Sequence, residues 1–171
     1  MTQPTDVRVA AADKVLSREE IARRVADVRA QGGTVVFTCG VFDLLHVGHV
    51  RYLEFAREQG DVLVVGVNSD NSVRQLGKGA DRPVVGEKER AEVVAALSSV
   101  TYVCLFDEQR PSETIRIIRP HVHVKDAAYE GAELPEAPAV KAVGGVIRYA
   151  PHVDGTSTSR LLRRIAPDGG A

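Results

Sequence analysis

The chain has 171 residues, with 44% hydrophobic and 26% charged residues, which is the size and balance of one globular domain. Lys plus Arg total 22 and Asp plus Glu total 23, and the net charge of -1 argues against a basic nucleic-acid binder and against a surface for anionic lipids. The apolar runs are too short to span a bilayer, and the N-terminus lacks a secretory signal pattern. Cys39 and Cys104 follow no disulfide pattern, so we expect free thiols in a cytoplasmic protein with no membrane or nucleic-acid partner.

The N-terminal region predicts a tail followed by a helix. Residues 1–13 show no hydrophobic period, which is typical of a flexible tail. A capping box that begins at Ser17, followed by apolar residues at helical spacing, predicts a leading helix within residues 14–33. We expect the folded domain to cover residues 14–166 and a second flexible tail to cover residues 167–171.

From residue 34 onward, strand-like and helix-like segments alternate. Apolar and β-branched runs predict strands at residues 34–39, 62–67, 101–106, 121–125 and 146–149. The main helical patterns lie at residues 49–59, 87–97, 111–119, 139–143 and 157–165. This alternation predicts an α/β fold, a single-domain doubly wound (Rossmann-like) parallel sheet of about five strands with helices on both faces. Ligands bind at the carboxyl ends of such strands, so the turns after the first and fourth strands and the start of the last helix should meet there.

A ten-residue segment joins the first predicted strand to the next helix, with the sequence Gly40-Val41-Phe42-Asp43-Leu44-Leu45-His46-Val47-Gly48-His49. Free backbone N–H groups and the helix dipole favour a phosphate at such a turn. His46 and His49 flank Gly48, so the backbone can approach an anion while both imidazoles point at it. The alternatives are helix capping and metal binding. A metal pair on a helix is normally spaced by four residues and needs further ligands, whereas these histidines are three apart. We therefore predict phosphate chemistry here and no metal site.

This Gly-x-Phe-Asp-x-x-His-x-Gly-His pattern after a strand resembles the signature of the nucleotidyltransferase superfamily of cytidylyl- and adenylyltransferases. The resemblance runs from about Leu16 to Ile165 and implies transfer of a nucleotidyl group from a nucleoside triphosphate, with release of pyrophosphate. It implies catalytic roles for His46 and His49. The residues that it implies for nucleotide binding in this turn are Gly40, Val41, Phe42 and Asp43. Asp43 either orients a histidine or binds the sugar, and Mg²⁺ is expected to accompany the triphosphate.

A run of hydroxyl side chains opens the last predicted helix. The run consists of Thr156, Ser157, Thr158 and Ser159, directly after Gly155. A single hydroxyl at a helix start is commonly an N-cap, but four in a row exceed what capping requires. The run resembles the Gly-x-Ser-Thr-Thr/Ser signature of the superfamily, which implies that it holds the triphosphate.

Three basic residues complete the predicted site. Lys78 and Arg82 lie in a glycine-containing loop that could close over phosphates, although an ordinary surface loop is an equal alternative for each. Lys125 ends the fourth predicted strand and faces the crevice, so we predict that it is catalytic and binds the acceptor together with Lys78 and Asp43. His121 and His123 lie on one face of that strand and are expected to be structural.

Within the superfamily, the chain is most similar to heptose-phosphate adenylyltransferases, which also form one half of bifunctional heptose kinase/adenylyltransferases. The resemblance implies that AMP passes from ATP to D-glycero-D-manno-heptose 1-phosphate, giving ADP-heptose, and that the protein is a dimer or larger homo-oligomer. Cys39 replaces an asparagine that is common in the family, and Lys88 replaces a glutamate two residues before Arg90. The family's Lys-Gly-Gly-Asp-Tyr becomes Lys125-Asp126-Ala127-Ala128-Tyr129, without either glycine.

Two alternatives belong to other functional classes. A cytidylyltransferase acting on glycerol 3-phosphate or a similar phospho-alcohol would typically carry Arg and Glu where this chain has His152 and Asp154. A catalytically silent nucleotide-binding protein is disfavoured by the intact histidine pair and hydroxyl run. For either transferase we expect direct in-line attack on the α-phosphorus, with no covalent enzyme intermediate.

Overall fold

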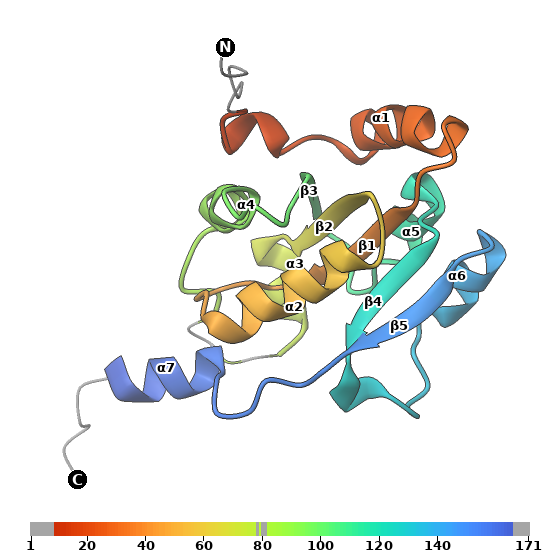
Figure 1. Cartoon of the computed structure of the whole chain (residues 1–171). Coiled ribbons are helices and arrows are strands. Elements are labelled where there is room, and N and C mark those ends of the chain that lie inside the picture. The colour runs from red at the N-terminus through yellow and green to blue at the C-terminus, as the bar shows by residue number, and fades with distance from the viewer. Residues whose placement is uncertain (1–8, 78, 80–81, 166–171) are drawn as a thin grey trace, which may run out of the picture.

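The computed structural model describes residues 9–77, 79 and 82–165, and it contains one five-stranded sheet in the order β3-β2-β1-β4-β5 (Figure 1). The strands are β1 (Val35–Gly40), β2 (Val62–Asn68), β3 (Tyr102–Phe106), β4 (Val122–Asp126) and β5 (Val146–Ala150). Every neighbouring pair is parallel. The predicted doubly wound parallel sheet of about five strands is therefore confirmed.

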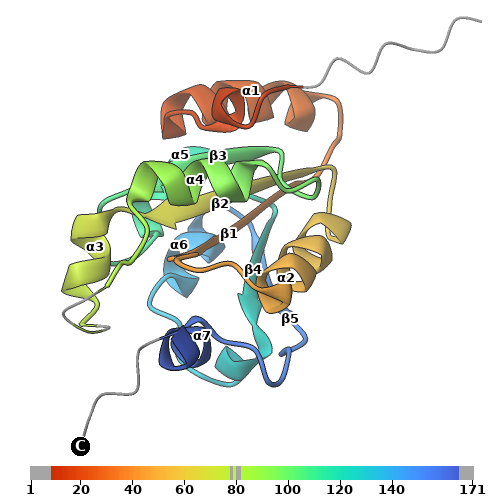
Figure 2. The same cartoon turned by 90° about the vertical axis from the view of Figure 1, so that its left-hand side faces the viewer.

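The helices lie on both faces of the sheet (Figures 1 and 2). They are the 3-10 turns η1 (Ala12–Lys14) and η2 (Ala127–Tyr129) and the helices α1 (Arg18–Ala30), α2 (Val47–Glu58), α3 (Asp70–Gln75), α4 (Glu87–Ala95), α5 (Ser112–Ile118), α6 (Ala137–Ala142) and α7 (Thr158–Ile165). Within the described ranges, none of these helices combines the length and apolarity needed to cross a membrane.

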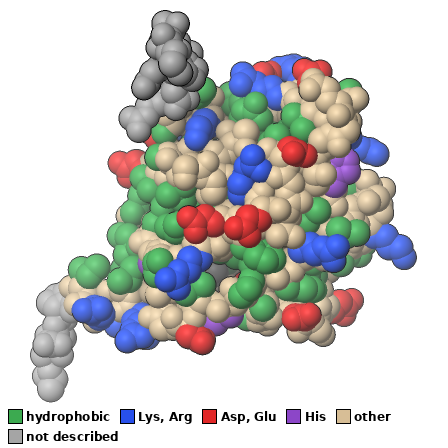
Figure 3. Space-filling view, viewed as in Figure 1, with side chains coloured by type: hydrophobic (Ala, Val, Ile, Leu, Met, Phe, Trp, Pro, Cys, Tyr) green, Lys and Arg blue, Asp and Glu red, His purple; other side chains and the backbone are tan. Residues whose placement is uncertain are grey.

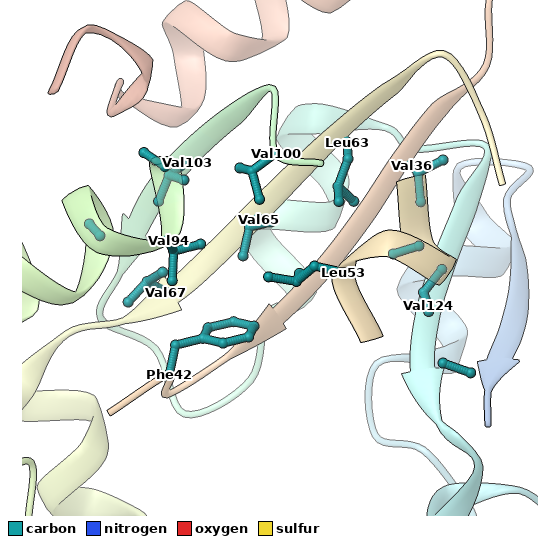
Figure 4. Close-up of a cluster of buried hydrophobic side chains, with 14 of the residues drawn as sticks. Val36, Phe42, Leu53, Leu63, Val65, Val67, Val94, Val100, Val103 and Val124 are labelled. Atoms are coloured by element: carbon teal, nitrogen blue, oxygen red, sulfur yellow. The ribbon is translucent and has the colours of Figure 1, made fainter. Parts of the chain in front are cut away.

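Two hydrophobic clusters, one on each face of the sheet, form the core. On one face, Leu53 of α2 and Val94 of α4 pack against the strands (Figure 4). On the other face, Ile21 of α1, Ile115 of α5 and Val140 of α6 do so. Each of these side chains is at most 2% exposed, and burying one such side chain contributes roughly 1.5–3 kcal/mol relative to leaving it in water. The central strands β1 and β2 are buried almost throughout because helices cover both faces of the sheet there.

Part of the predicted N-terminal tail has regular structure. Ser17 caps α1 by accepting a hydrogen bond from the Glu20 backbone N–H at 3.1 Å, which is half of the expected capping box. The Glu20 carboxylate pairs with arginines of α1 instead of returning to the cap. Ala12 and Asp13, which the sequence assigned to the flexible tail, form a 3-10 turn with Lys14. The Lys14 ammonium donates to two backbone carbonyls at the end of α4 and beyond it, at 3.0 and 3.1 Å.

The sheet order places a crevice between β1 and β4. From β1 the chain winds outward through β2 to β3, and then returns to the other side of β1 to form β4 and β5. The carboxyl ends of β1 and β4 therefore flank the point where the winding reverses, which is where doubly wound sheets bind ligands. The last helix, α7, lies beside the start of α2 in both views (Figures 1 and 2).

Charged side chains of both signs are scattered over the face shown in Figure 3. Apolar side chains gather on the side where α4 lies, and Val84 and Val93 are about half exposed. This mixed surface is consistent with the small net charge of the sequence.

Candidate active site

The turn after β1 is shaped by Phe42, which has a left-handed backbone with φ of 48°. Its ring is buried at the end of the core cluster (Figure 4) and fills the space beside Gly40, where a Cβ would lie 3.0 Å from the ring. The ring centroid also lies 5.3 Å from that of His49. Phe42, predicted to bind nucleotide, therefore supports the histidine from the core side.

His46 and His49 stack on each other, with ring centroids 3.9 Å apart and ring planes 25° apart. His46 occupies the N-cap position of α2, but its side chain makes no capping hydrogen bond. Both Nδ1 atoms are buried, and neither has a hydrogen-bond partner among the residues that the structure describes. Burial lowers the pKa of His46, and burial together with the His46 charge lowers the pKa of His49 to about 4. Burial therefore favours the uncharged form of both stacked rings.

Glycine is required between the two histidines because the start of the last helix lies against it. A Cβ at Gly48 would lie 2.5 Å from the Thr156 hydroxyl oxygen and 2.9 Å from the His46 ring. The Thr158 hydroxyl also donates to the Leu44 carbonyl at 3.1 Å. The first and third predicted segments therefore meet in space, although about 110 residues separate them along the chain.

The four hydroxyl residues divide into different roles. Ser157 accepts a hydrogen bond from the Arg160 backbone N–H at 3.2 Å, so for this residue the capping alternative describes what the structure contains. Thr156 donates to the Val153 carbonyl at 3.2 Å and faces the histidines. Thr158 and Ser159 line a cavity on the other side of His49. Gly155 has φ of 77°, a conformation that favours glycine.

Three cavities surround the carboxyl end of β1. The central cavity is lined by Cys39, Gly40, Val41, Phe42, His46, Gly48, His49, Tyr52, Lys125, Asp126, Tyr129, Pro151, His152, Val153 and Thr156. The Arg82 cavity is lined by Val41, Phe42, Asp43, His49, Arg82, Thr158 and Ser159. The Arg110 cavity is lined by Cys39, Gly40, Val41, Asn68, Leu76, Phe106, Gln109, Arg110, Pro111, Lys125, Tyr129, Pro135 and Glu136. The central cavity shares His49 with the Arg82 cavity and Lys125 with the Arg110 cavity, so the three predicted segments do meet.

Asp43 fastens the 82–85 loop to the turn after β1. Its side chain is fully buried, its carboxylate accepts hydrogen bonds from the backbone N–H groups of Val84 and Val85, and Arg82 Nε lies 2.6 Å from it. These contacts differ from both roles that the sequence suggested for Asp43, which were orienting a histidine and binding sugar. Arg82 is held at the rim of its cavity by the same contact. Lys78, the other predicted basic residue of this loop, lies outside the described residues.

Lys125 projects from the end of β4 into the junction of two cavities. Its ammonium lies 2.9 Å from the buried Glu136 carboxylate and 4.8 Å from the centre of the Tyr129 ring. His123 lies behind this pair, fully buried, with its ring stacked on Phe37 and Nε2 3.5 Å from Glu136. The neighbouring Lys125 and His123 lower the pKa of Glu136 to about 2, although burial acts to raise it.

The changed segment after Lys125 has its own contacts at the edge of the central cavity. Asp126 accepts a hydrogen bond from the Ala128 backbone N–H at 2.8 Å, which caps η2. Its carboxylate also lies 3.0 Å from His152 Nδ1, from the segment after β5. The pair therefore joins the ends of β4 and β5 beside the cavity.

Three residues at the site were not among the residues predicted to bind or react. Arg90 is buried and donates to the carbonyls of Val41, Asn68 and Val85, so it joins the ends of β1 and β2 to the 82–85 loop. Glu136 comes from an acidic loop without any period. The resemblance to Lys-Gly-Gly-Asp-Tyr would have pointed to Tyr129. Among the described residues, no group of three or more His, Cys, Asp or Glu side chains is arranged to hold a metal ion.

Comparison with known proteins gives a consistent assignment. Residues 37–164 match the family model described as Cytidylyltransferase-like. The bifunctional protein HldE of Methylobacillus flagellatus is 48% identical over 157 residues, which cover 92% of this chain and 32% of that protein. The bifunctional protein HldE of Trichlorobacter lovleyi is 44% identical over 152 residues, covering 89% of this chain and 31% of that protein. The chain thus spans about a third of the length of these curated relatives.

A solved structure supports the same fold. The lipopolysaccharide core biosynthesis protein from Thermoplasma volcanium is 27% identical, with a TM-score of 0.58, over 71% of this chain and 98% of that one. The family model covers most of the chain and includes the β1–α2 turn, Lys125 and the start of α7. The chain therefore belongs to the cytidylyltransferase-like family and is a nucleotidyltransferase.

Proposed function

We propose that this chain transfers AMP from ATP to D-glycero-D-manno-heptose 1-phosphate, giving ADP-heptose and pyrophosphate. The observation that carries the transfer chemistry is the stacked, uncharged pair of His46 and His49, which lines the central cavity, while His49 also lines the Arg82 cavity. The sugar is supported by the resemblance of the motifs to heptose-phosphate adenylyltransferases. It is also supported by the similarity to HldE proteins and to a protein named for lipopolysaccharide core biosynthesis.

The cavities suggest how ATP would bind. The Arg82 cavity combines the Arg82 guanidinium with the hydroxyls of Thr158 and Ser159, which suits the β- and γ-phosphates. The central cavity, which is bordered by Tyr129 and by the segment that carries His152, would receive the nucleoside. The α-phosphate would then lie beside His49, which lines both cavities.

The reaction would proceed by direct displacement. A phosphate oxygen of the sugar phosphate attacks the α-phosphorus, a new P–O bond forms, and the bond to the oxygen that bridges the α- and β-phosphates breaks. The attacking group is already an anion, so no general base is needed and positioning dominates. His46 and His49 would donate hydrogen bonds to oxygens whose negative charge grows, and Lys125 would meet the acceptor phosphate from the junction with the Arg110 cavity.

Mg²⁺ would enter as the complex with the triphosphate. This hard cation is commonly bound by substrate phosphates and water together with one or two carboxylates. Asp43 is the carboxylate that lines the Arg82 cavity, but its oxygens are already engaged by Arg82 and two backbone N–H groups. The phosphate oxygens themselves would therefore hold the ion, and its charge would stabilise the leaving pyrophosphate.

Pyrophosphate release tests this proposal. ATP, CTP, GTP and UTP would each be incubated with the heptose 1-phosphate and, separately, with glycerol 3-phosphate. We expect release with ATP and the heptose phosphate alone. Release with CTP and glycerol 3-phosphate would replace the proposal with the cytidylyltransferase alternative. Binding of ATP without release in any mixture would instead indicate another acceptor or a protein that binds nucleotide without turnover.

A further inference from the structure

Lys125 is a partly enclosed cation at the junction of the central and Arg110 cavities. Its side chain is 17% exposed, and its ammonium lies 2.9 Å from a Glu136 oxygen. Glu136 belongs to a different segment of the chain, between η2 and α6, and its side chain is 5% exposed. A buried ion pair is costly to desolvate and is weak grounds for stability by itself. Stability alone therefore does not explain why the Lys125–Glu136 ion pair lies beside the proposed reaction centre.

Among the described groups around Lys125, Glu136 is the one that contacts the ammonium with an opposite charge. Cys39 of β1 is a buried thiol with a pKa raised to about 12, so it is uncharged at neutral pH. His123, on the same strand, has a pKa that is lowered by burial, and Tyr129 offers the face of its ring. Asp126 is next in the chain and faces His152, and Arg110 lines the far cavity with a like charge. Among the described residues, Glu136 is the carboxylate within ion-pair distance of Lys125.

His123 also lies beside the Glu136 carboxylate. His123 Nε2 lies 3.5 Å from the same Glu136 oxygen that contacts Lys125. The His123 ring is stacked on Phe37, and its Nδ1 lies 3.2 Å from the Phe37 carbonyl oxygen of β1. The carboxylate therefore lies between a buried ring and the ammonium, although the 3.5 Å approach of Nε2 is not a hydrogen bond.

We propose that Glu136 is a positioning residue for Lys125: its carboxylate holds the charged ammonium at the junction of the two cavities, ready for the phosphate of the acceptor. On acceptor binding, the ammonium exchanges part of its contact with Glu136 for a phosphate oxygen. The inference rests on the proposed function only for the identity of the acceptor, because the ion pair exists without it. No bond to carbon or phosphorus changes in this step.

Removing the carboxylate charge should change how Lys125 titrates. Burial acts to lower the pKa of Lys125, but Cys39 and the contact with Glu136 outweigh it and leave the pKa raised. Cys39 can contribute only as a thiolate, in strongly alkaline solution, so at neutral pH Glu136 is the one of these two groups that carries a charge. In Glu136→Gln the burial remains while the carboxylate charge is lost. The ammonium should then lose its proton at lower pH, and the enzyme should fail earlier as the solution becomes alkaline.

The first test needs no substrate. Competitive labelling of the full chain with acetic anhydride at a series of pH values, read by mass spectrometry, gives the titration midpoint of Lys125, with the exposed Lys141 as internal reference. We expect Glu136→Gln to lower this midpoint by about one pH unit or more. Glu133→Gln removes an exposed carboxylate from the same loop and should leave it unchanged. An unchanged midpoint in Glu136→Gln overturns the proposal.

The wild-type protein provides a measurement that does not depend on a variant folding. A midpoint for Lys125 below that of Lys141 would show that burial dominates over Glu136, and it would overturn the proposal even if Glu136→Gln proved unfolded by circular dichroism. Glu136→Asp keeps the charge and should retain most of the wild-type midpoint. A midpoint as low in Glu136→Asp as in Glu136→Gln would also contradict the proposal.

The second test reads the reaction. In Glu136→Gln, we expect KM for the sugar phosphate to rise about tenfold, KM for ATP to change less than about twofold, and the alkaline limb of activity to move to lower pH. Equal losses of every kinetic parameter with an unmoved alkaline limb would mean a purely structural role and would overturn the proposal. If the wild-type enzyme ignores the sugar phosphate, the proposed function fails, while the labelling result still decides the role of Glu136.

Discussion

The turn that carries His46 and His49 and the corner that carries Lys125 line the same cavity, but their side chains are held differently. The two imidazoles leave their Nδ1 atoms without a described protein partner, whereas the Lys125 ammonium already contacts Glu136 and Tyr129. A group with an unpaired polar atom gains a contact when the ligand arrives, but a paired group must exchange one. We therefore expect changes at the histidine turn to affect mainly turnover and changes at the Lys125 corner to affect mainly acceptor affinity.

The largest effect should follow loss of His49. In His49→Ala we expect kcat to fall roughly a hundredfold or more, because the imidazole would donate to an oxygen that becomes more negative in the transition state. Pyrophosphate release at saturating substrates measures this. His121→Asn is a matched control, because His121 Nδ1 accepts a hydrogen bond from the Val35 N–H and an amide oxygen can replace it. Normal turnover in His49→Ala would remove the histidine pair from the mechanism.

Gly48→Ala should have opposite effects on the stability of α2 and on the contact between this turn and the start of α7. Alanine favours a helix over glycine by about 1 kcal/mol, but the new Cβ would lie 2.5 Å from the Thr156 hydroxyl oxygen. We expect kcat to fall about tenfold, with the thermal midpoint little changed. Gly86→Ala is the control, because the nearest atom to its Cβ would be 3.9 Å away. Wild-type turnover in Gly48→Ala would mean that the turn and the start of α7 need not touch.

Asp43→Asn tests whether the loop fastened to the turn matters for phosphate binding. The asparagine keeps one acceptor oxygen for Val84 or Val85 but loses the charge that holds Arg82. We expect KM for ATP to rise about fivefold to tenfold, with kcat reduced less. Steady-state kinetics with ATP as the varied substrate measure this. A rise in KM for the sugar phosphate alone would instead support the earlier prediction that Asp43 binds sugar.

Tyr129 provides a smaller test on the Lys125 side of the comparison. Tyr129→Leu removes a ring whose centre lies 4.8 Å from the ammonium, a cation–π contact that contributes about 0.5–1 kcal/mol at an exposed site. We expect KM for the sugar phosphate to rise about threefold. Tyr129→Phe keeps the ring and should behave as wild type. If both variants raise KM equally, the Tyr129 hydroxyl, and not the contact of the ring with the ammonium, supports acceptor binding.

The contrast between the two regions also explains what could be predicted from the sequence. The histidine turn lies within ten consecutive residues, so its residue types and spacing show the chemistry directly. The Lys125 corner is assembled from β4, η2 and the segment before α6, and the partner of Lys125 is fixed by packing across these elements. Lys125 was predicted from its place at a strand end, but its pairing with Glu136 leaves no pattern in the sequence.

The individual role of each residue within the predicted motifs could not be predicted from the sequence either. Ser157 and Thr158 are adjacent hydroxyl residues of similar chemistry, yet one caps α7 and the other lines the Arg82 cavity. The difference arises from where the helix begins and which side of it faces His49. Likewise, the sequence suggested that Asp43 acts on a histidine or a sugar. Its actual partners, the backbone N–H groups of Val84 and Val85, lie about forty residues away, and no nearby sequence pattern indicates this contact.

The smallest effect concerns stability rather than activity. In the unfolded chain a histidine has a pKa near 6.5, whereas burial lowers the pKa of His49 to about 4 in the folded protein. Between these two pKa values the unfolded chain binds more protons than the folded protein. The contribution of His49 to the free energy of unfolding is therefore fully present above about pH 6.5 and is lost as the pH is lowered toward 4.

Urea unfolding at about pH 7.5 and about pH 5 measures this loss. After allowance for partial exposure of the ring, we expect the loss to be roughly 1 kcal/mol smaller in His49→Gln than in the wild type. His46 and His123, whose pKa values are also lowered by burial, are present in both proteins and so contribute to both losses. Equal losses in the two proteins would mean that the pKa of His49 is not lowered in the folded protein, and burial would then not keep this ring uncharged near pH 5.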